Sequence, residues 1–362
     1  MTQNPPPQGA QQLDPERYRR MDSIRLAQRD LLDFAGFGPA EAPFEILHTE
    51  PGLRVRKYSH DRADGPVMLI VPAPIKRSYI WDLAPGSSVV RRCLEQGMRV
   101  YLAEWVPVQS ADHPFGLDDY AGRLLASCHR VVADDSGQER VLLAGHSLGG
   151  VLASMFACLH ADLVRALVVL ESPLHFGADA GDFAPMIASV PDAKPIAHAF
   201  GDVPGSFLNA VSAAAAPHAF QFERLLDRCV SCVNPDTFRL HMRVERWTYD
   251  EFPLPGKLFH EIVELLYRHD YFMLGKLTIG GRAIGPADLR SSLLCVVDPR
   301  SRVIPLESVL PFHEAAAASH KSLLYYEGDI GVNIQHVGVL VGPTAHERLW
   351  PQIFAFLAAS PP

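Results

Sequence analysis

The stretch from 140 to 170 constrains the fold of this 362-residue chain more than any other part of it. Four apolar residues, 141–144, lead into the run GHSLGG at 145–150, and apolar residues at helical spacing begin at Val151. A strand, a sharp turn and a helix in this order form a nucleophile elbow, which exposes the central residue of the turn above a sheet. Small residues are needed at Gly145 and Gly149 because the turn brings backbone close together. We predict that Ser147 is a nucleophile; the alternative is an ordinary turn in which Ser147 caps the helix.

Composition indicates a folded protein without a polyanionic partner. Hydrophobic residues make up 48% and charged residues 20% of the chain, which allows a large core. The formal charge of −8 argues against binding to nucleic acid. The start, MTQNPPPQGAQQ, lacks the basic and apolar regions of a signal peptide, and no apolar run approaches the ~20 residues of a membrane helix. We expect a cytoplasmic protein with no transmembrane segment and with reduced, buried cysteines.

Short apolar strands alternate with helices on both sides of the elbow. Strands are predicted at 66–71, 99–104, 166–170, 293–297 and 322–326, an edge strand within 49–58, and helices at 15–37, 87–96, 117–133 and 346–359. This alternation predicts an α/β fold with a doubly wound, mainly parallel sheet. Residues 1–14 form a Pro/Gln-rich tail that is expected to be disordered.

The alternation stops between 175 and 286, where Pro, Gly, aromatic and helical stretches take over. A sheet does not need so long a connection, so we interpret this region as a mostly helical cap inserted over the carboxyl ends of the strands. The predicted organisation is a core of residues 15–174 and 287–362 with a cap at 175–286.

Two further residues complete a candidate catalytic set. Asp298 ends the predicted strand 293–297, and His336 lies in the loop after the last predicted strand. The order serine, acid, histidine is that of the α/β-hydrolase triad, in which the histidine takes the serine proton and the acid orients the histidine. Asp329 competes with Asp298, which sits in an Asp-Pro pair and could merely start a turn. His146 is interpreted as a packing or orienting residue.

An oxyanion hole needs two N–H donors close to Ser147. The backbone N–H of Leu148, at the start of the predicted helix, is one candidate. The second donor normally follows the strand that ends here at Val71, but Pro74 has no N–H to offer. We therefore predict Ile75 as the second donor, with Ala73 as the weaker alternative.

Motifs outside the elbow carry a resemblance to one family. They are the segment 69–105, LDDY at 117–120, GDVPGSFLN at 201–209, RWTYD at 246–250 and LGKLTIGGR at 274–282. Together they resemble the polyhydroxyalkanoate synthases, which build poly-3-hydroxybutyrate, and especially the catalytic subunits of the class III type. The resemblance implies an α/β-hydrolase-fold acyltransferase that moves a hydroxyacyl group from a CoA thioester through an acyl-enzyme on Ser147. It also implies no cofactor or metal, a second synthase subunit or a homodimer as partner, and association with polymer granules.

Three positions depart from the family pattern. The family nucleophile is usually a cysteine in G-x-C-x-G-G, whereas this chain has Ser147. The acid usually sits in a compact D-x-x-V-P, whereas four residues separate Asp298 from Val303, and Gln335 replaces the usual glycine before the histidine. The serine favours a second hypothesis, a hydrolase of esters, thioesters or hydroxyalkanoate oligomers on the same scaffold. A third, a catalytically silent granule-binding or partner-binding subunit, is disfavoured by the complete set of serine, acid and histidine.

Overall fold

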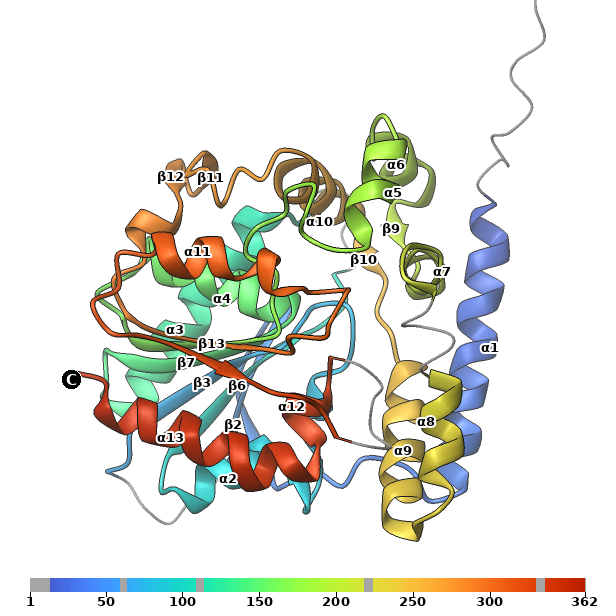
Figure 1. Cartoon of the computed structure of the whole chain (residues 1–362), viewed down its shortest axis with the longest axis horizontal. Coiled ribbons are helices and arrows are strands. Elements are labelled where there is room, and N and C mark those ends of the chain that lie inside the picture. The colour runs from blue at the N-terminus through green and yellow to red at the C-terminus, as the bar shows by residue number, and fades with distance from the viewer. Residues whose placement is uncertain (1–13, 59–63, 109–113, 218–223, 330–335, 362) are drawn as a thin grey trace, which may run out of the picture.

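An eight-stranded sheet forms the centre of the protein (Figure 1). The computed structural model describes residues 14–58, 64–108, 114–217, 224–329 and 336–361. The sheet has the order β1-β2-β6-β3-β7-β8-β13-β14. Its strands are β1 Phe44–Glu50, β2 Leu53–Tyr58, β3 Val67–Val71, β6 Arg99–Trp105, β7 Val141–His146, β8 Val164–Leu170, β13 Ser292–Val297 and β14 Lys321–Tyr325. Neighbouring strands from β6 to β14 are parallel, which confirms the predicted α/β fold with a mainly parallel sheet.

The antiparallel side of the sheet differs from the prediction. The segment 49–58, expected to be one edge strand, contains the end of β1, a turn at Pro51-Gly52 and the whole of β2. β1 pairs with β2 and β2 with β6, both antiparallel, so β1 is the edge strand. The Pro-Gly pair explains the turn, because proline fixes the entry to a turn and glycine adopts positive φ, here 91°.

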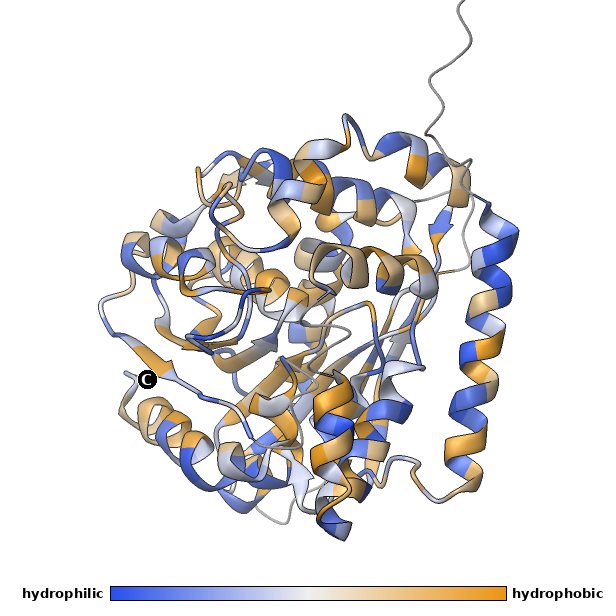
Figure 2. Cartoon of the chain, turned by 45° about the vertical axis from the view of Figure 1, so that its right-hand side comes forward, coloured by the Kyte–Doolittle hydropathy of each residue, from blue (hydrophilic) through white to orange (hydrophobic). Residues whose placement is uncertain are grey.

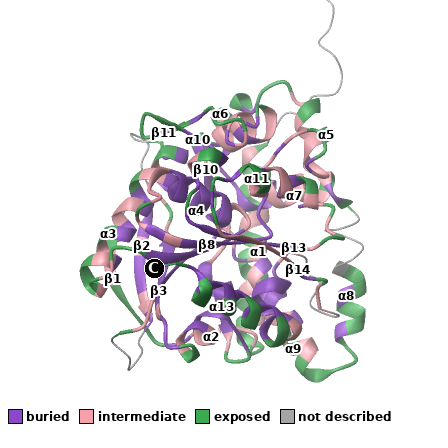
Figure 3. Ribbon diagram, turned by 60° about the vertical axis from the view of Figure 1, so that its left-hand side comes forward, coloured by how far each residue is buried: buried purple, intermediate pink, exposed green. Residues whose placement is uncertain are grey.

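Helices cover both faces of the sheet, which is why all residues of the central strands β3, β7 and β13 are buried (Figure 3). Alternate residues of β3 point to opposite faces: Leu69 belongs to one hydrophobic cluster and Ile70 to the other. The first cluster includes residues of α3 Leu125–Ser136, α4 Leu148–Leu159 and α11 Leu310–Ala315. The second includes residues of α2 Val89–Glu95, α12 Gly338–Val341 and α13 Trp350–Ala359.

Shorter elements join these layers. π-helical turns precede two of the helices, η2 Asp118–Leu124 before α3 and η7 Ala345–Leu349 before α13. The remaining connecting elements are η1 Ser78–Trp81, β4 Asp82–Ala84, β5 Ser87–Ser88, η5 Pro286–Asp288 and η6 Leu306–Ser308. Four cysteines are buried and free as predicted, whereas Cys229 and Cys232 are exposed, which corrects the prediction for that pair.

The region 175–286 is mostly helical and lies along one side of the sheet (Figure 1). Its helices are α5 Phe183–Ser189, α6 Lys194–Phe200, α7 Gly205–Ala215, α8 Arg224–Ser231, α9 Pro235–Thr248, α10 Gly256–Glu261 and the π-helical η4 Ile262–Arg268. Two small antiparallel strand pairs accompany them, β9 Asp202–Val203 with β10 Leu254–Pro255 and β11 Leu277–Ile279 with β12 Arg282–Ile284. We keep the boundaries 175 and 286 as a proposal for the cap.

The N-terminal helix α1, Pro15–Phe34, packs against α7 and α9. Asp14 caps it by accepting hydrogen bonds from the N–H groups of Glu16 and Arg17. Figure 2 shows many hydrophilic segments along α1, whereas the strands of the sheet are mostly hydrophobic. The rest of the predicted tail, 1–13, lies outside the described residues. None of the helices in the described ranges is long and apolar enough to cross a membrane.

Candidate active site

Ser147 occupies a strained turn between β7 and α4. Its backbone has φ 56° and ψ −133°, a conformation that residues other than glycine rarely adopt. The N–H of Ser147 donates to the Leu170 carbonyl at 3.1 Å, and its carbonyl accepts from Gly150 at 2.9 Å and Val151 at 3.2 Å. These bonds hold the turn in place between the sheet and the start of α4, so the surrounding structure maintains the strain.

The glycines beside Ser147 are needed for close packing, as the sequence indicated. A Cβ atom on Gly145 would lie 2.6 Å from the Gly149 carbonyl oxygen. One on Gly149 would lie 2.2 Å from the Val71 carbonyl oxygen, and one on Gly150 would lie 2.0 Å from Ser172 Oγ. The end of β3 therefore packs directly against the first turn of α4, which brings the loop after Val71 to the elbow.

The two predicted oxyanion donors lie on these two segments. Leu148 is the first residue of α4, so its N–H has no partner within the helix. In the loop after β3, the Pro72 carbonyl accepts from Trp105 Nε1 at 2.7 Å, and the Ile75 carbonyl accepts from the Phe252 N–H at 2.9 Å. The Ile75 N–H is not a donor in the backbone hydrogen bonds of the described residues. Leu148 and Ile75, with Ala73 as the alternative, stay predictions.

His336 lies beside the elbow. Its ring centroid is 4.5 Å from that of His146, the residue before Ser147, and the rings are inclined by 44°. His146 Nε2 also donates a hydrogen bond to the His336 carbonyl. His336 itself has φ 71°, a second unusual backbone conformation within the site. The structure thus places His336 next to His146, the residue that precedes Ser147, and His146 has the packing role expected of it. The roles of Ser147 as nucleophile and His336 as base stay predictions.

In the described residues, the expected acid Asp298 forms no hydrogen bond with His336. His336 Nδ1 instead faces the carboxylate of Glu171, with Oε2 at 3.1 Å. Asp298 accepts from the Arg300 N–H at 2.8 Å and from Arg300 Nε at 3.2 Å. The prediction that Asp298 is the acid paired with His336 is therefore corrected: the Asp-Pro-Arg turn directs the Asp298 carboxylate towards Arg300.

Asp329, the competing acid, has a structural role in the described residues. It accepts hydrogen bonds from Tyr326 Oη at 2.5 Å and from the N–H of Thr344 at 2.8 Å. It thereby joins the end of β14 to the start of the last helical segment.

Glu171 is not among the predicted site residues, although one feature of the sequence marks it. A charged residue at the carboxyl end of an apolar strand, directly after RALVVL, lies where parallel strands present functional side chains.

Burial shifts the pKa values of the three side chains that meet here, those of His146, Glu171 and His336. Although a quarter of its side-chain surface is exposed, burial lowers the pKa of His336 to about 4. Burial, helped by neighbouring His336, lowers the pKa of His146 to about 3. Burial also raises the pKa of Glu171 to about 7; His146 opposes this rise and the negative charge of Asp298 adds to it. Both imidazoles are therefore neutral at neutral pH, which is the state that a general base requires.

His146, Glu171 and His336 also meet the distance requirement for holding a metal ion. Each offers one ligand atom, and these atoms lie within 4.8 Å of one another. Two hydrogen bonds already connect the three residues, from His146 to the His336 carbonyl and between His336 and Glu171. Acid–base pairing therefore accounts for the cluster, and we assign no metal to it.

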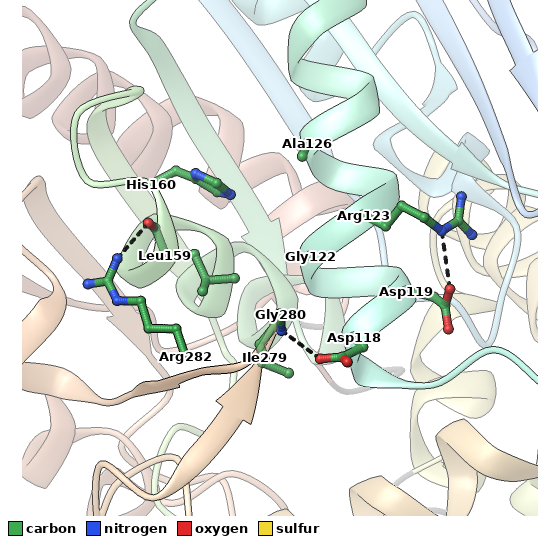
Figure 4. Close-up of a pocket in the computed structure, with 10 residues that line it drawn as sticks. All are labelled: Asp118, Asp119, Gly122, Arg123, Ala126, Leu159, His160, Ile279, Gly280 and Arg282. Atoms are coloured by element: carbon green, nitrogen blue, oxygen red, sulfur yellow. Dashed lines mark hydrogen bonds and ion pairs between the residues drawn. The ribbon is translucent and has the colours of Figure 1, made fainter.

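A separate surface pocket lies at the other end of α4 (Figure 4). It has a volume of about 620 Å³, and the described residues that line it include Leu159, the last residue of α4. Its two arginines are engaged: Arg123 donates to Asp119 at 3.2 Å, and Arg282 donates to the Leu159 carbonyl at 3.0 Å. A helix of twelve residues separates this pocket from Ser147 by roughly 18 Å, so it is not part of the elbow site.

The fold and the elbow define an α/β hydrolase, and residues 66–223 match the family model described as alpha/beta hydrolase fold. Among solved structures, the monoacylglycerol lipase of Paleococcus ferrophilus is similar with a TM-score of 0.52 and 16% identity, over 85% of this chain and 99% of that one. A thermophilic esterase from Thermogutta terrifontis gives a TM-score of 0.51 and 16% identity, over 88% and 98% of the two chains. These likenesses show the fold.

Several curated relatives share one name. The Haloferax mediterranei poly(3-hydroxyalkanoate) polymerase subunit PhaC is 30% identical over 88% of this chain, which spans 64% of the length of that relative. Proteins of the same name from Haloarcula marismortui and Allochromatium vinosum are 26% and 24% identical over 94% and 92% of this chain, covering 70% and 94% of their own lengths. The chain is thus related to the poly(3-hydroxyalkanoate) polymerases over most of its length and has the α/β-hydrolase fold.

Proposed function

We propose that this protein is an acyltransferase that moves a hydroxyacyl group from a CoA thioester through an acyl-enzyme on Ser147 to the hydroxyl end of a growing polyester. One observation carries the proposal. A serine held at φ 56° at the start of α4, with His336 packed against the preceding residue His146, occurs in a chain related to poly(3-hydroxyalkanoate) polymerases over most of its length.

The reaction would proceed in two acyl transfers. Ser147 Oγ attacks the thioester carbonyl while His336 Nε2 takes its proton, and the oxyanion is stabilised by the N–H groups of Leu148 and Ile75. The C–S bond breaks, and the thiolate of CoA leaves with the proton held by His336. The hydroxyl end of the polyester then attacks the Ser147 ester and gives its proton to His336. His336 returns this proton to Ser147 Oγ as the bond between Ser147 and the acyl group breaks. Each cycle lengthens the chain by one unit and regenerates the enzyme.

The serine nucleophile favours a second candidate function, hydrolysis of esters, thioesters or hydroxyalkanoate oligomers. An oxygen ester on Ser147 lies lower in free energy than the thioester that formed it, so the first step is downhill. Transfer to another hydroxyl is then nearly isoenergetic, and water competes with the polyester for the same acyl group. The outcome depends on how completely residues 175–286 exclude water from the acyl-enzyme.

Incubation of the purified full chain with 3-hydroxybutyryl-CoA tests the proposal, with polymer and free 3-hydroxybutyrate measured separately. We expect CoA release with polymer as the main product. Ser147→Ala should lower the rate by several orders of magnitude, because the members of a triad act as a unit. Free acid as the main product would establish the hydrolase, and near-normal turnover by Ser147→Ala would rule out both functions as written.

The partner is part of the proposal. The relatives are named as polymerase subunits, and we propose that this chain also works with a second synthase subunit or a second copy of itself, at the surface of polymer granules. Light scattering of the purified protein with and without 3-hydroxybutyryl-CoA measures self-association. A monomer with full polymerising activity would contradict this part of the proposal.

A further inference from the structure

Glu171 is a buried carboxylate placed by the sheet itself. It directly follows β8, and its N–H donates to the Val296 carbonyl of the neighbouring strand β13 at 2.9 Å. Its backbone has φ 41°, which is unusual for any residue other than glycine. Only 4% of the residue is exposed. Strained backbone at a buried acid is maintained only where the surrounding structure determines it, and such positions cluster in functional sites.

Two carboxylates lie at the ends of adjacent parallel strands, Glu171 after β8 and Asp298 after β13. Only Glu171 faces His336. The side chain of Glu171 is 5% exposed and lies 3.1 Å from His336 Nδ1. The Asp298 side chain is 19% exposed and is paired with Arg300, whose own side chain is 62% exposed. Asp298 is nevertheless close enough for its charge to favour protonation of Glu171.

The geometry points to Glu171, in place of Asp298, as the positioning residue that orients His336 for proton transfer with Ser147. This inference rests on the proposed acyl transfer. A neutral His336 that donates its Nδ1 hydrogen to ionised Glu171 keeps Nε2 free to accept the Ser147 proton. When that proton arrives, the imidazolium is stabilised by the carboxylate 3.1 Å away. No other described residue accepts a side-chain hydrogen bond from the His336 ring.

The same contact predicts a pH dependence. Protonated Glu171 would donate to Nδ1 and force the imidazole hydrogen onto Nε2, the wrong tautomer for a base. Activity should therefore rise with pH through about 7, the pKa to which burial raises Glu171. The titratable groups that face Glu171 are His146 from β7, His336, Asp298 after β13 and Tyr326 after β14. In Asp298→Asn, activity should begin to rise at a lower pH, because the substitution removes the negative charge that favours protonation of Glu171.

Labelling of Ser147 by a fluorophosphonate tests this role without depending on the natural substrate. In the full chain, Glu171→Gln should slow labelling by about 10³–10⁴-fold, as expected when the histidine is held in the wrong tautomer. Glu171→Asp, which keeps the charge, should recover part of the rate. Asp298→Asn should stay within about tenfold of the wild-type rate. A low-field proton signal from the Nδ1 hydrogen in the ¹H NMR spectrum should disappear in Glu171→Gln and persist in Asp298→Asn.

The outcomes separate this inference from the proposed function. Wild-type protein that labels, together with a Glu171→Gln variant that labels at the same rate, overturns the role of Glu171. A loss confined to Asp298→Asn restores Asp298 as the acid. Wild-type protein that does not label at Ser147 overturns the nucleophile and the inference together. Thermal unfolding of each variant shows whether a slow rate reflects an unfolded chain.

Discussion

The role of Glu171 and its burial favour opposite protonation states. The carboxylate form orients His336, whereas burial favours the neutral form and raises the pKa from 4.5 to about 7. Between pH 4.5 and about 7, the folded state therefore holds the proton of Glu171 more tightly than the unfolded state does. The stabilisation is fully present below pH 4.5 and is lost as the pH rises through about 7. The ionised state that the proposed chemistry uses is the less stable one.

Replacement of Glu171 by glutamine should remove this pH dependence. A shift from 4.5 to about 7 corresponds to roughly 3 kcal/mol, so the free energy of unfolding of Glu171→Gln should rise relative to wild type by up to that amount between pH 4 and pH 8. Urea unfolding at several pH values measures the difference. The lowered pKa values of His146 and His336 act in the opposite direction, because their stabilisation is lost as the pH falls below 6.5. A difference that does not change with pH would show that Glu171 titrates normally.

Among the elements, α9 and the loop after β3 are joined by buried charges. Asp250, just after α9, accepts from Arg77 Nε at 3.2 Å and from Arg246 at 2.7 Å, and Arg29 of α1 lies 3.2 Å from it. Burial alone would raise the pKa of Asp250, but Arg77, Arg246 and Arg29 hold it below its ordinary value. Lys76, next to Ile75, is paired with Glu251 at 2.6 Å. The loop that carries the predicted oxyanion donor is thus held by the cap region and the N-terminal helix.

Asp250→Asn should lower both stability and turnover. It leaves the buried Arg246 and the partly exposed Arg29 and Arg77 without their shared carboxylate. We therefore expect a loss on the order of 3 kcal/mol in the free energy of unfolding and a lower kcat with little change in KM. Asp30→Asn is the matched control, because Asp30 also pairs with Arg29, at 2.7 Å, but its side chain is 64% exposed. That control should cost about 0.5 kcal/mol or less. A normal kcat in Asp250→Asn would show that the loop is positioned without this network.

At the scale of the whole molecule, one hydrophobic cluster crosses the boundary between the proposed core and cap. Leu69 and Val169 of the sheet belong to the same cluster as Phe207 of α7 and Leu258 of α10. Phe207 is 7% exposed, and its ring lies 5.3 Å from that of Tyr18 in α1. The N-terminal helix, the inserted region and the sheet therefore share one buried interior.

This shared interior predicts a single cooperative unfolding transition. The calorimetric and van't Hoff enthalpies should agree, and Phe207→Ala should lower the stability of the whole chain by about 3–5 kcal/mol. Phe34→Ala is the control; this residue is 92% exposed, so its removal should have little effect. Two separate transitions, of which Phe207→Ala shifts only one, would mean that the inserted region unfolds independently.

The sequence predicted the features that depend on local pattern. Apolar runs located the central strands, and the glycines around Ser147 located the elbow. Long-range geometry was not predictable. Asp298 and Glu171 end adjacent strands, and the path of the chain at His336 determines which of them meets the imidazole. The contact of Arg29 with Asp250 joins residues 221 positions apart, and no local pattern indicates it.

The backbone conformation of Ser147 has an evolutionary consequence. At φ 56° and ψ −133° a serine costs about 1–3 kcal/mol, whereas glycine adopts these angles freely and loses only about 0.5–1 kcal/mol through its more flexible unfolded chain. Ser147→Gly should therefore be about 1 kcal/mol more stable than the wild type and inactive. A random library of this gene selected only for resistance to proteolysis should become enriched in glycine at position 147, and one selected for acyl transfer should retain serine. Depletion of glycine under the first selection would show that the turn is not strained.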